Sequence, residues 1–453
     1  MKYKKPIMIL VAIFFLLYIS ACSSTKPPEK HGPPISDTIN TEIIAEDEPN
    51  VDLPTNDAVE GTNPPFEGKI VIITDDPSNS YSYFSAYPLI EKYGKDKVIH
   101  LMWPVNFPNE PEEVINKYLL ELSADSEIKA IIIKQPAFFN AIVALEKLHV
   151  VRKDIYVICL ASSFSFDDIN GYLQTADFVL LTDKLNIGSA ITEKAKKLGS
   201  ETLVYYYFTP YTSDQFHAKK HELIKKKCTS LGIKFVDTNT LNPNATNPGN
   251  TASMIEAEQF VLVDVPKKVI EYGKNTAFYS ELCFLQTQLI EAVLDTGAIY
   301  PSPCCPYPFY RYPNNDWGVM PLAEASYFST GNTNGFVNCL DNAIAQIKSG
   351  LEGKGDLSRL STWPVFDTFM YASTAAEYAI KWINGEVPKD GVDVEVLTQL
   401  MEEYAGVNVY LTPFVDDGTH DYYERKSEPT GETYENFLLM RMDYVTFEEL
   451  GVK

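Results

Sequence analysis

The chain has 453 residues, an apolar content of 45% and a formal net charge of −23. A chain of this length and composition folds into two or three globular domains with sizeable cores. The strong negative charge argues against nucleic acid as a partner, and it disfavours adsorption of the folded part to anionic lipid, because both surfaces attract basic proteins.

The first 21 residues have the pattern of a bacterial lipoprotein signal peptide. Lys2, Lys4 and Lys5 precede an apolar segment over residues 7–19, which is shorter than the ~20 residues that span a bilayer. It ends in Ile19-Ser20-Ala21-Cys22, which resembles a lipobox. We expect cleavage before Cys22, diacylation of Cys22 and a lipid-anchored location on the outer face of the cell membrane. The alternative is an uncleaved signal anchor.

Residues 22–65 are rich in Pro, Ser, Thr, Asn and acidic residues and contain few large apolar ones, so we expect a disordered tether. The first globular segment begins at Phe66. Four consecutive apolar residues at 70–73 predict a strand buried on both faces. A polar loop and an aromatic-rich helix ending at Gly94 follow that strand. This order is the opening half of a βαβ unit.

The same pattern of strand and amphipathic helix repeats up to residue 185. Further strands are expected at 98–103, 130–133, 155–160 and 178–181, with a helix from a capping box at Asn109 to Ala124 and another at 137–148. This spacing predicts an α/β fold in which residues 66–185 form a first lobe around a doubly wound, mostly parallel sheet.

The pattern then restarts, which predicts a second α/β lobe over residues 186–319. We expect helices at 186–198, 213–231, 252–273 (broken near Pro266) and 286–295, and strands at 203–208, 233–236, 276–280 and 298–300. Residues 301–317 are rich in proline and aromatic residues and predict an irregular loop. Helices at 335–348 and 367–384 and a strand-like segment at 408–417 follow. We expect residues 320–453 to cross between the lobes and to return partly to the first.

The segments 231–236 (LGIKFV), 260–280 (FVLVDVPKKVIEYGKNTAFYS) and 297–313 (GAIYPSPCCPYPFYRYP) resemble a family of bacterial lipoproteins that carries only a domain-of-unknown-function label. That family belongs to the periplasmic-binding-protein superfamily. The resemblance covers about residues 68–317 and implies a two-lobed, type 1 periplasmic-binding-protein-like fold outside the cytoplasm. It implies no particular substrate.

The sequence lacks the nucleotide-binding and catalytic fingerprints of common enzyme classes, so we predict no catalytic residue and no cofactor. Ligands of open α/β sheets bind beyond the carboxyl ends of the strands, where a few polar groups and aromatic faces recognise a small polar molecule. The candidate ligand-binding residues in the loops after the strands are Ser78, Asn79, Ser80, Tyr81, Gln135, Ser162, Asp183, Thr209, Tyr211, Glu281 and Arg311. Loop capping and turn formation are the alternative roles for the polar ones. Arg311 pairs with an anionic group or packs on its aromatic neighbours.

Metal sites are not indicated. His217 and His221 share a helix face, but the lysines around them repel a cation, and the spacing of Asp416, Asp417 and Asp421 fits no calcium loop. An exported protein can form disulfides. Their pairing does not follow from spacing, and we expect at most one or two bridges among Cys159, Cys228, Cys283, Cys304, Cys305 and Cys339.

These observations favour a lipid-anchored, extracytoplasmic solute-binding protein. It would close two lobes around a small polar ligand, such as a sugar or nucleoside, and present it to a membrane permease or a sensor. Two alternatives remain from the sequence. One is a surface enzyme acting on an envelope polymer or a small polar substrate, and the other is an interaction lipoprotein that has lost its pocket.

Overall fold

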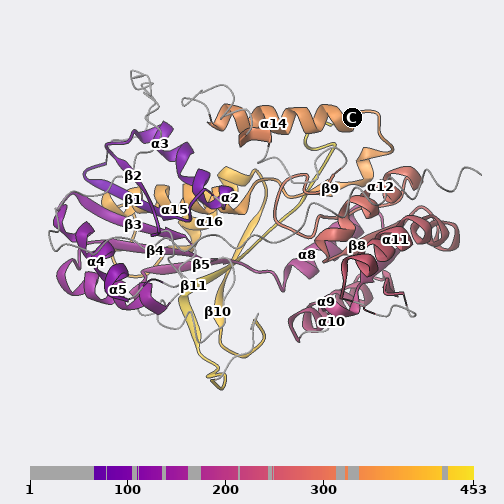
Figure 1. Ribbon diagram of the computed structural model, residues 1–453, viewed down its shortest axis with the longest axis horizontal. Coiled ribbons are helices and arrows are strands. Elements are labelled where there is room, and N and C mark those ends of the chain that lie inside the picture. Colours follow the sequence, from indigo (N-terminus) through magenta and orange to yellow (C-terminus); the bar gives the residue numbers. More distant parts are fainter. Residues whose placement is uncertain are drawn as a thin grey trace, which may run out of the picture. The chain divides into compact units, whose positions relative to one another are not determined.

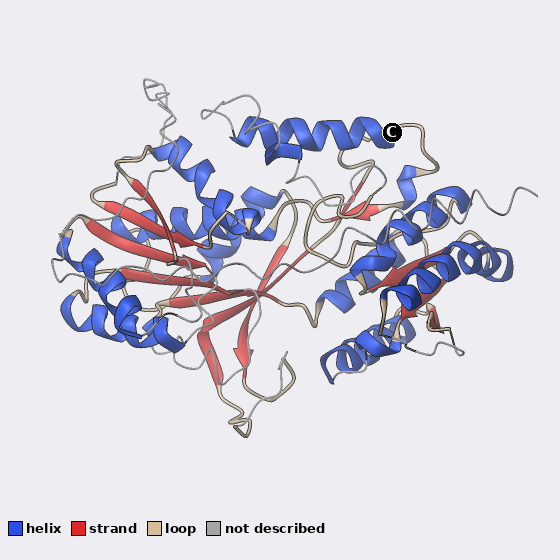
Figure 2. Cartoon of the chain, viewed as in Figure 1, coloured by secondary structure: helices blue, strands red, loops and turns tan. Residues whose placement is uncertain are grey.

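Two main β-sheets flanked by helices, and a third sheet of two short strands, make up the computed structural model (Figures 1 and 2). The structure describes residues 66–452 except 78, 105–109, 111, 135–138, 162–174, 213–214, 243–246, 248, 313–321, 325–335 and 421–426. Within this part of the chain, no helix is long and apolar enough to cross a bilayer.

The larger sheet has seven strands in the order β10-β11-β5-β4-β3-β1-β2. All neighbouring strands are parallel except the edge pair β10 and β11. The strands are β1 Lys69–Thr74, β2 Val98–Met102, β3 Ile128–Lys134, β4 Tyr156–Ala161, β5 Phe178–Thr182, β10 Val409–Val415 and β11 Thr433–Met442.

Strand β1 is buried on both faces, as its unbroken apolar run predicts. Ile70 and Ile72 pack in a core with the alanine-rich face of α15. Val71 and Ile73 pack on the opposite side in a core that includes α4 and α5. The helices associated with this sheet are α2 Ser80–Tyr83, α3 Tyr87–Tyr93, α4 Glu112–Glu121, α5 Phe139–Val151, α15 Asp367–Ile383 and α16 Val394–Ala405.

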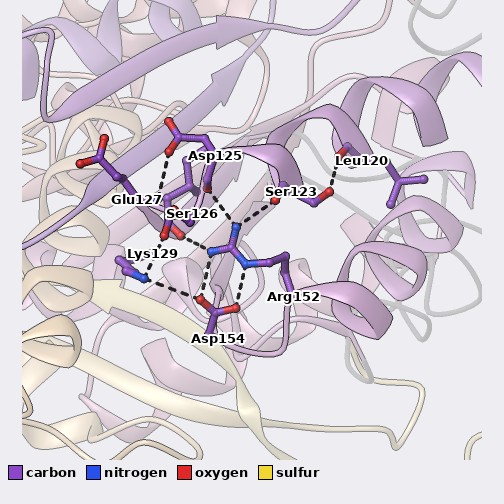
Figure 3. A network of polar contacts seen from close by, with 9 residues as sticks. Leu120, Ser123, Asp125, Ser126, Glu127, Lys129, Arg152 and Asp154 are labelled. Atoms are coloured by element: carbon purple, nitrogen blue, oxygen red, sulfur yellow. Dashed lines mark hydrogen bonds and ion pairs between the residues drawn. The ribbon is translucent and has the colours of Figure 1, made fainter.

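A polar network closes the loops at the amino ends of β3 and β4 (Figure 3). The guanidinium of Arg152 donates to the backbone carbonyls of Ser123, Asp125 and Ile128 at 2.8–3.2 Å. It also makes a two-point contact with the carboxylate of Asp154, at 2.8 and 3.0 Å. One side chain therefore satisfies three backbone acceptors at the end of the sheet that lies opposite the strand carboxyl ends.

The smaller sheet contains β6 Thr202–Tyr207, β7 Lys234–Asn239 and β8 Thr276–Ser280, parallel and in the order β7-β6-β8. Its helices are α8 Ile187–Lys197, α9 Thr209–Thr212, α10 Gln215–Ser230, α11 Thr251–Tyr272, α12 Gln286–Thr296 and α14 Phe336–Leu351. Val204, Tyr206 and Phe278 pack in a core with α11, α12 and α14. Both sheets are α/β and mostly parallel, which confirms the predicted fold class.

Short backbone pairings join the segments that run between the sheets. A bridge connects Tyr300 to Leu360, and β9 Ser361–Thr362 pairs with β12 Val445–Thr446. Between these points the chain returns to the larger sheet as α15, which packs on β1, β3 and β4. Strand β11 pairs in parallel with β5, which precedes it by more than 200 residues.

Three elements differ from the prediction. Helix α11 is continuous through Pro266, because Ala257, Val261 and Val265 anchor one face of it in the core of the smaller sheet and packing overrides the weak local break. Residues 298–300 make only isolated bridges. The tail contributes two long antiparallel strands, β10 and β11, where the sequence indicated one strand-like segment.

Candidate functional site

Polar side chains gather where the parallel strands of the larger sheet end. Asp75 follows β1, and Lys134 is the last residue of β3. Thr182 is the last residue of β5, and Asp183 follows it. Asp367 joins them from the start of α15. We call Asp75, Lys134, Thr182 and Asp367 the strand-end cluster. Carboxyl ends of parallel strands are where open α/β sheets bind ligands, so this is the candidate ligand site.

Lys134 is the central charge of the cluster. Its side chain is buried, and Nζ donates to the backbone carbonyl of Thr368 at 3.1 Å. Burial lowers the pKa of Lys134 to about 8, although the negative charges of Asp367 and Asp75 partly offset this effect. Burial separates the Lys134 ammonium group from bulk solvent, and the carbonyl of Thr368 accepts a hydrogen bond from it.

Asp367 is buried beside Lys134 and is held by hydroxyl groups. Its Oδ2 accepts a hydrogen bond of 2.7 Å from Thr182 Oγ1, and Thr182 Oγ1 also lies 2.7 Å from the hydroxyl of Tyr371. Burial raises the pKa of Asp367, while Thr182 and the charge of Lys134 act in the opposite direction. The pKa of Asp75 is also raised by burial. Both carboxyl groups are therefore easier to protonate than in water.

Of the four predicted ligand-binding residues after β1, the structure describes Asn79, Ser80 and Tyr81. Asn79 does not cap α2; its Nδ2 donates to Asp75 Oδ2 at 2.8 Å, and so it orients a member of the strand-end cluster. Ser80 begins α2. The ring of Tyr81 stacks on Tyr307 from the proline-rich loop, with centroids 4.4 Å apart and planes inclined by 8°. This stacking connects α2, beside the larger sheet, to the proline-rich loop.

Asp183 mainly organises its own loop. Its carboxylate accepts hydrogen bonds from the backbone and side-chain nitrogens of Asn186 at 3.0 and 2.6 Å, and His420 Nε2 lies 3.4 Å from Oδ1. Burial alone would raise the pKa of Asp183, but these neighbours outweigh it and lower the pKa. The arrangement is that of an Asp turn at the start of α8.

Glu281, which follows β8, has a nearly buried side chain that lies next to the buried Lys220. Its carboxylate accepts from the hydroxyl of Tyr205 at 2.9 Å and lies 3.5 Å from Lys220 Nζ and 3.6 Å from His217 Nε2. Thr209 is exposed, and its hydroxyl accepts from Asn239 Nδ2 at 2.8 Å. The acidic group predicted after β8 therefore lies among two basic side chains and a phenol.

The remaining predicted positions are only partly within the structure. Cys22, Ser78, Gln135 and Ser162 lie outside the described residues, and Tyr211 is described only as backbone in α9. Arg311 lies with its guanidinium carbon 5.4 Å from the ring centre of Tyr310, a cation–π contact.

The proline-rich loop carries backbone strain. Phe309 and Arg311 have φ values of 55° and 61°, which non-glycine residues rarely adopt. The loop is held there because the amide of Phe309 donates to Thr362 Oγ1 at 2.7 Å and the hydroxyl of Tyr312 donates to the carbonyl of Ser361 at 2.8 Å. Strain maintained by surrounding contacts is common at binding sites.

Two cysteines of this loop meet a third one from the turn after β8. The Sγ atoms of Cys283, Cys304 and Cys305 lie 3.4–3.5 Å apart. Hydrogen bonds from the thiols of Cys304 and Cys305 lower the pKa of Cys283 to about 3, while burial raises the pKa of Cys304. The six cysteines in the described part of the chain are free thiols. The sequence did not suggest this group, because Cys283 is distant from the adjacent pair along the chain.

The histidines and aspartates that the sequence suggested only weakly as metal ligands contact other protein groups. His217 faces Glu281, whereas His221 Nε2 lies 2.6 Å from Asp237 Oδ1. Asp416 Oδ2 accepts two hydrogen bonds from Thr430, and Asp421 lies outside the described residues. Within the described ranges, the three cysteines form the group of His, Cys and acidic residues whose ligand atoms converge closely enough for one metal ion.

Two relatives of this chain are themselves uncharacterized proteins. An uncharacterized protein of Treponema pallidum (strain Nichols) is 27% identical over 182 residues, and a second one is 24% identical over 146 residues; the matches span 80% and 64% of their lengths and 40% and 32% of this chain.

A solved structure has the same fold over most of the chain. A "Putative transcriptional regulator" from Clostridium difficile 630 matches 84% of this chain and 100% of its own, with a TM-score of 0.64 and 22% identity. The likeness to a sugar ABC transporter from Actinomyces odontolyticus ATCC 17982 is weaker. It matches 71% of this chain and 84% of its own, with a TM-score of 0.40 and 9% identity.

A family model matches residues 68–346, a span that contains most of both sheets, the three cysteines and the proline-rich loop. The predicted membership of a domain-of-unknown-function family is confirmed: the chain belongs to the family described as "Protein of unknown function (DUF3798)".

Proposed function

We propose that this protein is a lipid-anchored, extracytoplasmic solute-binding protein that captures a small polar ligand by non-covalent contacts. Cys22 would carry the acyl chains, and residues 22–65 would act as the tether. Residues 66–185 and 186–319 would form the two lobes, with residues 320–453 crossing between them. The bound ligand would then be presented to a membrane permease or a sensor.

The observation that carries this proposal is the buried charge at the strand carboxyl ends. Lys134 is buried with a lowered pKa, and Asp367 and Asp75 have raised pKa values. Each shift means that the surroundings oppose the charged form. Residues whose pKa values are perturbed in this way are enriched at functional sites. A ligand that forms hydrogen bonds with their charged forms would stabilise those forms.

The chemistry of the cluster suits a ligand rich in hydroxyl groups. The carboxyl groups of Asp75 and Asp367 can accept from hydroxyls, and Lys134 can donate to one. The stacked rings of Tyr81 and Tyr307 come from the loop after β1 and from the proline-rich loop, and aromatic faces near such groups favour sugar rings and bases. A sugar or nucleoside is therefore the class that we propose.

The alternative of an interaction protein receives less support. In the described part of the proline-rich loop, residues 301–312, the large side chains of Phe309 and Tyr312 are buried, so this segment does not present them as an exposed apolar contact surface.

The test is thermal melting of the full chain, purified in detergent, against sugars, nucleosides, amino acids and short peptides. A ligand at 100 times its Kd stabilises the folded state by about 2.7 kcal/mol. We expect one chemical class to raise the melting temperature and to be recovered unchanged. Lys134→Met should abolish that shift, whereas the exposed Lys197→Met should retain it.

Other outcomes would contradict the proposal. A hit recovered as a chemically altered product would identify an enzyme. A hit whose shift survives Lys134→Met would place the ligand away from the strand-end cluster. The absence of any shift across all four classes would count against small-molecule capture.

A further inference from the structure

We propose that Cys283, Cys304 and Cys305 form a binding site for one soft metal ion, with Cu(I) as the best match. The three Sγ atoms lie within 3.5 Å of one another, and they come from two separate segments. Cys283 begins the turn after β8, while Cys304 and Cys305 lie at the start of the proline-rich loop.

The spacing suits direct coordination. Bonds of about 2.3 Å from one metal ion to three coplanar sulfurs would place those sulfurs about 4 Å apart. The thiols would therefore need to separate by only about half an ångström, which side-chain rotation can supply. Cys283 is exposed and Cys304 and Cys305 are partly buried, so an ion can reach the site from solvent.

The donor set selects the kind of ion. Thiolate sulfur favours Cu(I), zinc and iron–sulfur clusters over the hard cations that prefer oxygen ligands. Within the described ranges, no histidine or carboxylate supplements the three sulfurs. Structural zinc sites almost always have four ligands, whereas three sulfurs complete the shell of a trigonal Cu(I) ion.

Two cationic side chains act on the thiols of the site. The positive charges of Arg311 and Lys184 act on Cys283 and Cys305 respectively. Three thiolates around one monovalent cation leave two negative charges, which these two side chains partly offset.

Contacts within the protein fix the backbone conformation of the loop that contains Cys304 and Cys305. Phe309 and Arg311 hold left-handed backbone conformations, and the contacts of Phe309 with Thr362 and of Tyr312 with Ser361 fix the segment that follows the two cysteines. Preorganised ligands lower the cost of binding. This site goes beyond the proposed function, because it requires neither the strand-end cluster nor a polar solute.

The test uses the full chain, purified in detergent under a thiol reductant and titrated with Cu(I) in competition with a chromogenic Cu(I) chelator. We expect one Cu(I) ion per chain. Cys283→Ser removes an exposed ligand without opening a core cavity, and it should weaken binding about 100-fold or more, since even partners outside the ligand shell contribute 10–100-fold. Cys305→Ser should do the same.

Two controls keep the result interpretable. Cys339→Ser removes a buried thiol outside the cluster and should leave Cu(I) affinity unchanged. Each variant must show the far-UV circular dichroism of the parent chain. Equal Cu(I) affinity in Cys283→Ser, Cys305→Ser and the parent would overturn the proposal, as would tighter binding of Zn(II) than of Cu(I).

A disulfide is the competing fate of these thiols. Peptide mass mapping of the protein isolated from the cell envelope under alkylation should show all three cysteines as free or metal-protected thiols. A disulfide linking any two of them in most of the isolated molecules would refute the three-sulfur site.

Discussion

Replacing Lys134 by Met should stabilise the protein. Lys134 is buried and its pKa is lowered from 10.5 to about 8, which corresponds to about 3 kcal/mol against the charged form in the folded state. Methionine fills a similar volume without that charge. The substitution also removes the hydrogen bond to the carbonyl of Thr368, which costs about 1–2 kcal/mol. We therefore expect a net stabilisation of about 1–2 kcal/mol at pH 7.

The pH dependence gives a second, independent readout. Because the pKa of Lys134 is lower in the folded state, the unfolded chain binds more protons between pH 8 and pH 10.5, and stability of the parent chain rises with pH in that window. The variant lacks this contribution. Its advantage should shrink as pH increases from 8 and should reverse near pH 10.5, where only the lost hydrogen bond remains.

The assay is urea denaturation followed by circular dichroism at pH 7, 9 and 10.5, with Lys197→Met as a matched control. Lys197 is exposed, and its replacement should change stability little at any of these pH values. If Lys134→Met destabilises the chain at pH 7, or if the difference from the parent does not change with pH, Lys134 is a structural residue and the argument for a ligand site fails.

Three further predictions concern single side chains. Arg152→Met removes hydrogen bonds to three backbone carbonyls and should destabilise the chain by about 2–3 kcal/mol in urea denaturation, while leaving ligand-induced melting shifts intact. Asp183→Asn should be less stable than the parent at neutral pH, and the gap should close as pH falls through the lowered pKa of Asp183 below 3.8; a constant gap would contradict this. Arg311→Gly should be more stable than Arg311→Ala by about 1 kcal/mol, because only glycine adopts φ = 61° without strain; equal stability would show that the loop relaxes.

Hydrophobic pattern predicted the four central strands β5, β4, β3 and β1 of the larger sheet because these strands are buried on both faces. The runs at β1, β3, β4 and β5 are continuous and apolar, and continuous runs are readable without tertiary information. Strand β10 alternates buried and exposed residues and pairs with β11 across a loop. The sequence therefore indicated only the segment at β10 as a strand, whereas pairing in the sheet produces both β10 and β11.

The expectation that ligands bind beyond the strand carboxyl ends pointed to the edge of the sheet where the strand-end cluster lies. It did not identify Lys134 or Asp367 as members of that cluster. The predicted strand at 130–133 stopped one position before Lys134, although a lysine that ends a fully apolar run is itself a signal of a buried charge. Asp367 could not be found this way, since it meets Thr182 from 185 positions further along the chain. The same limitation hid the contact of Cys283 with Cys304 and Cys305, which depends on the turn after β8 meeting the proline-rich loop.

The charges of the Arg152 network and those of the strand-end cluster respond to folding in opposite ways. At the amino ends, the contact between Arg152 and Asp154 raises the pKa of the first and lowers that of the second, so folding favours both charges. At the carboxyl ends, Lys134, Asp75 and Asp367 are shifted towards their neutral forms, so folding opposes them. Charges of the first kind stabilise the fold directly. Charges of the second kind weaken it, and a molecule that completes their hydrogen bonds when it binds would account for their presence at this edge of the sheet.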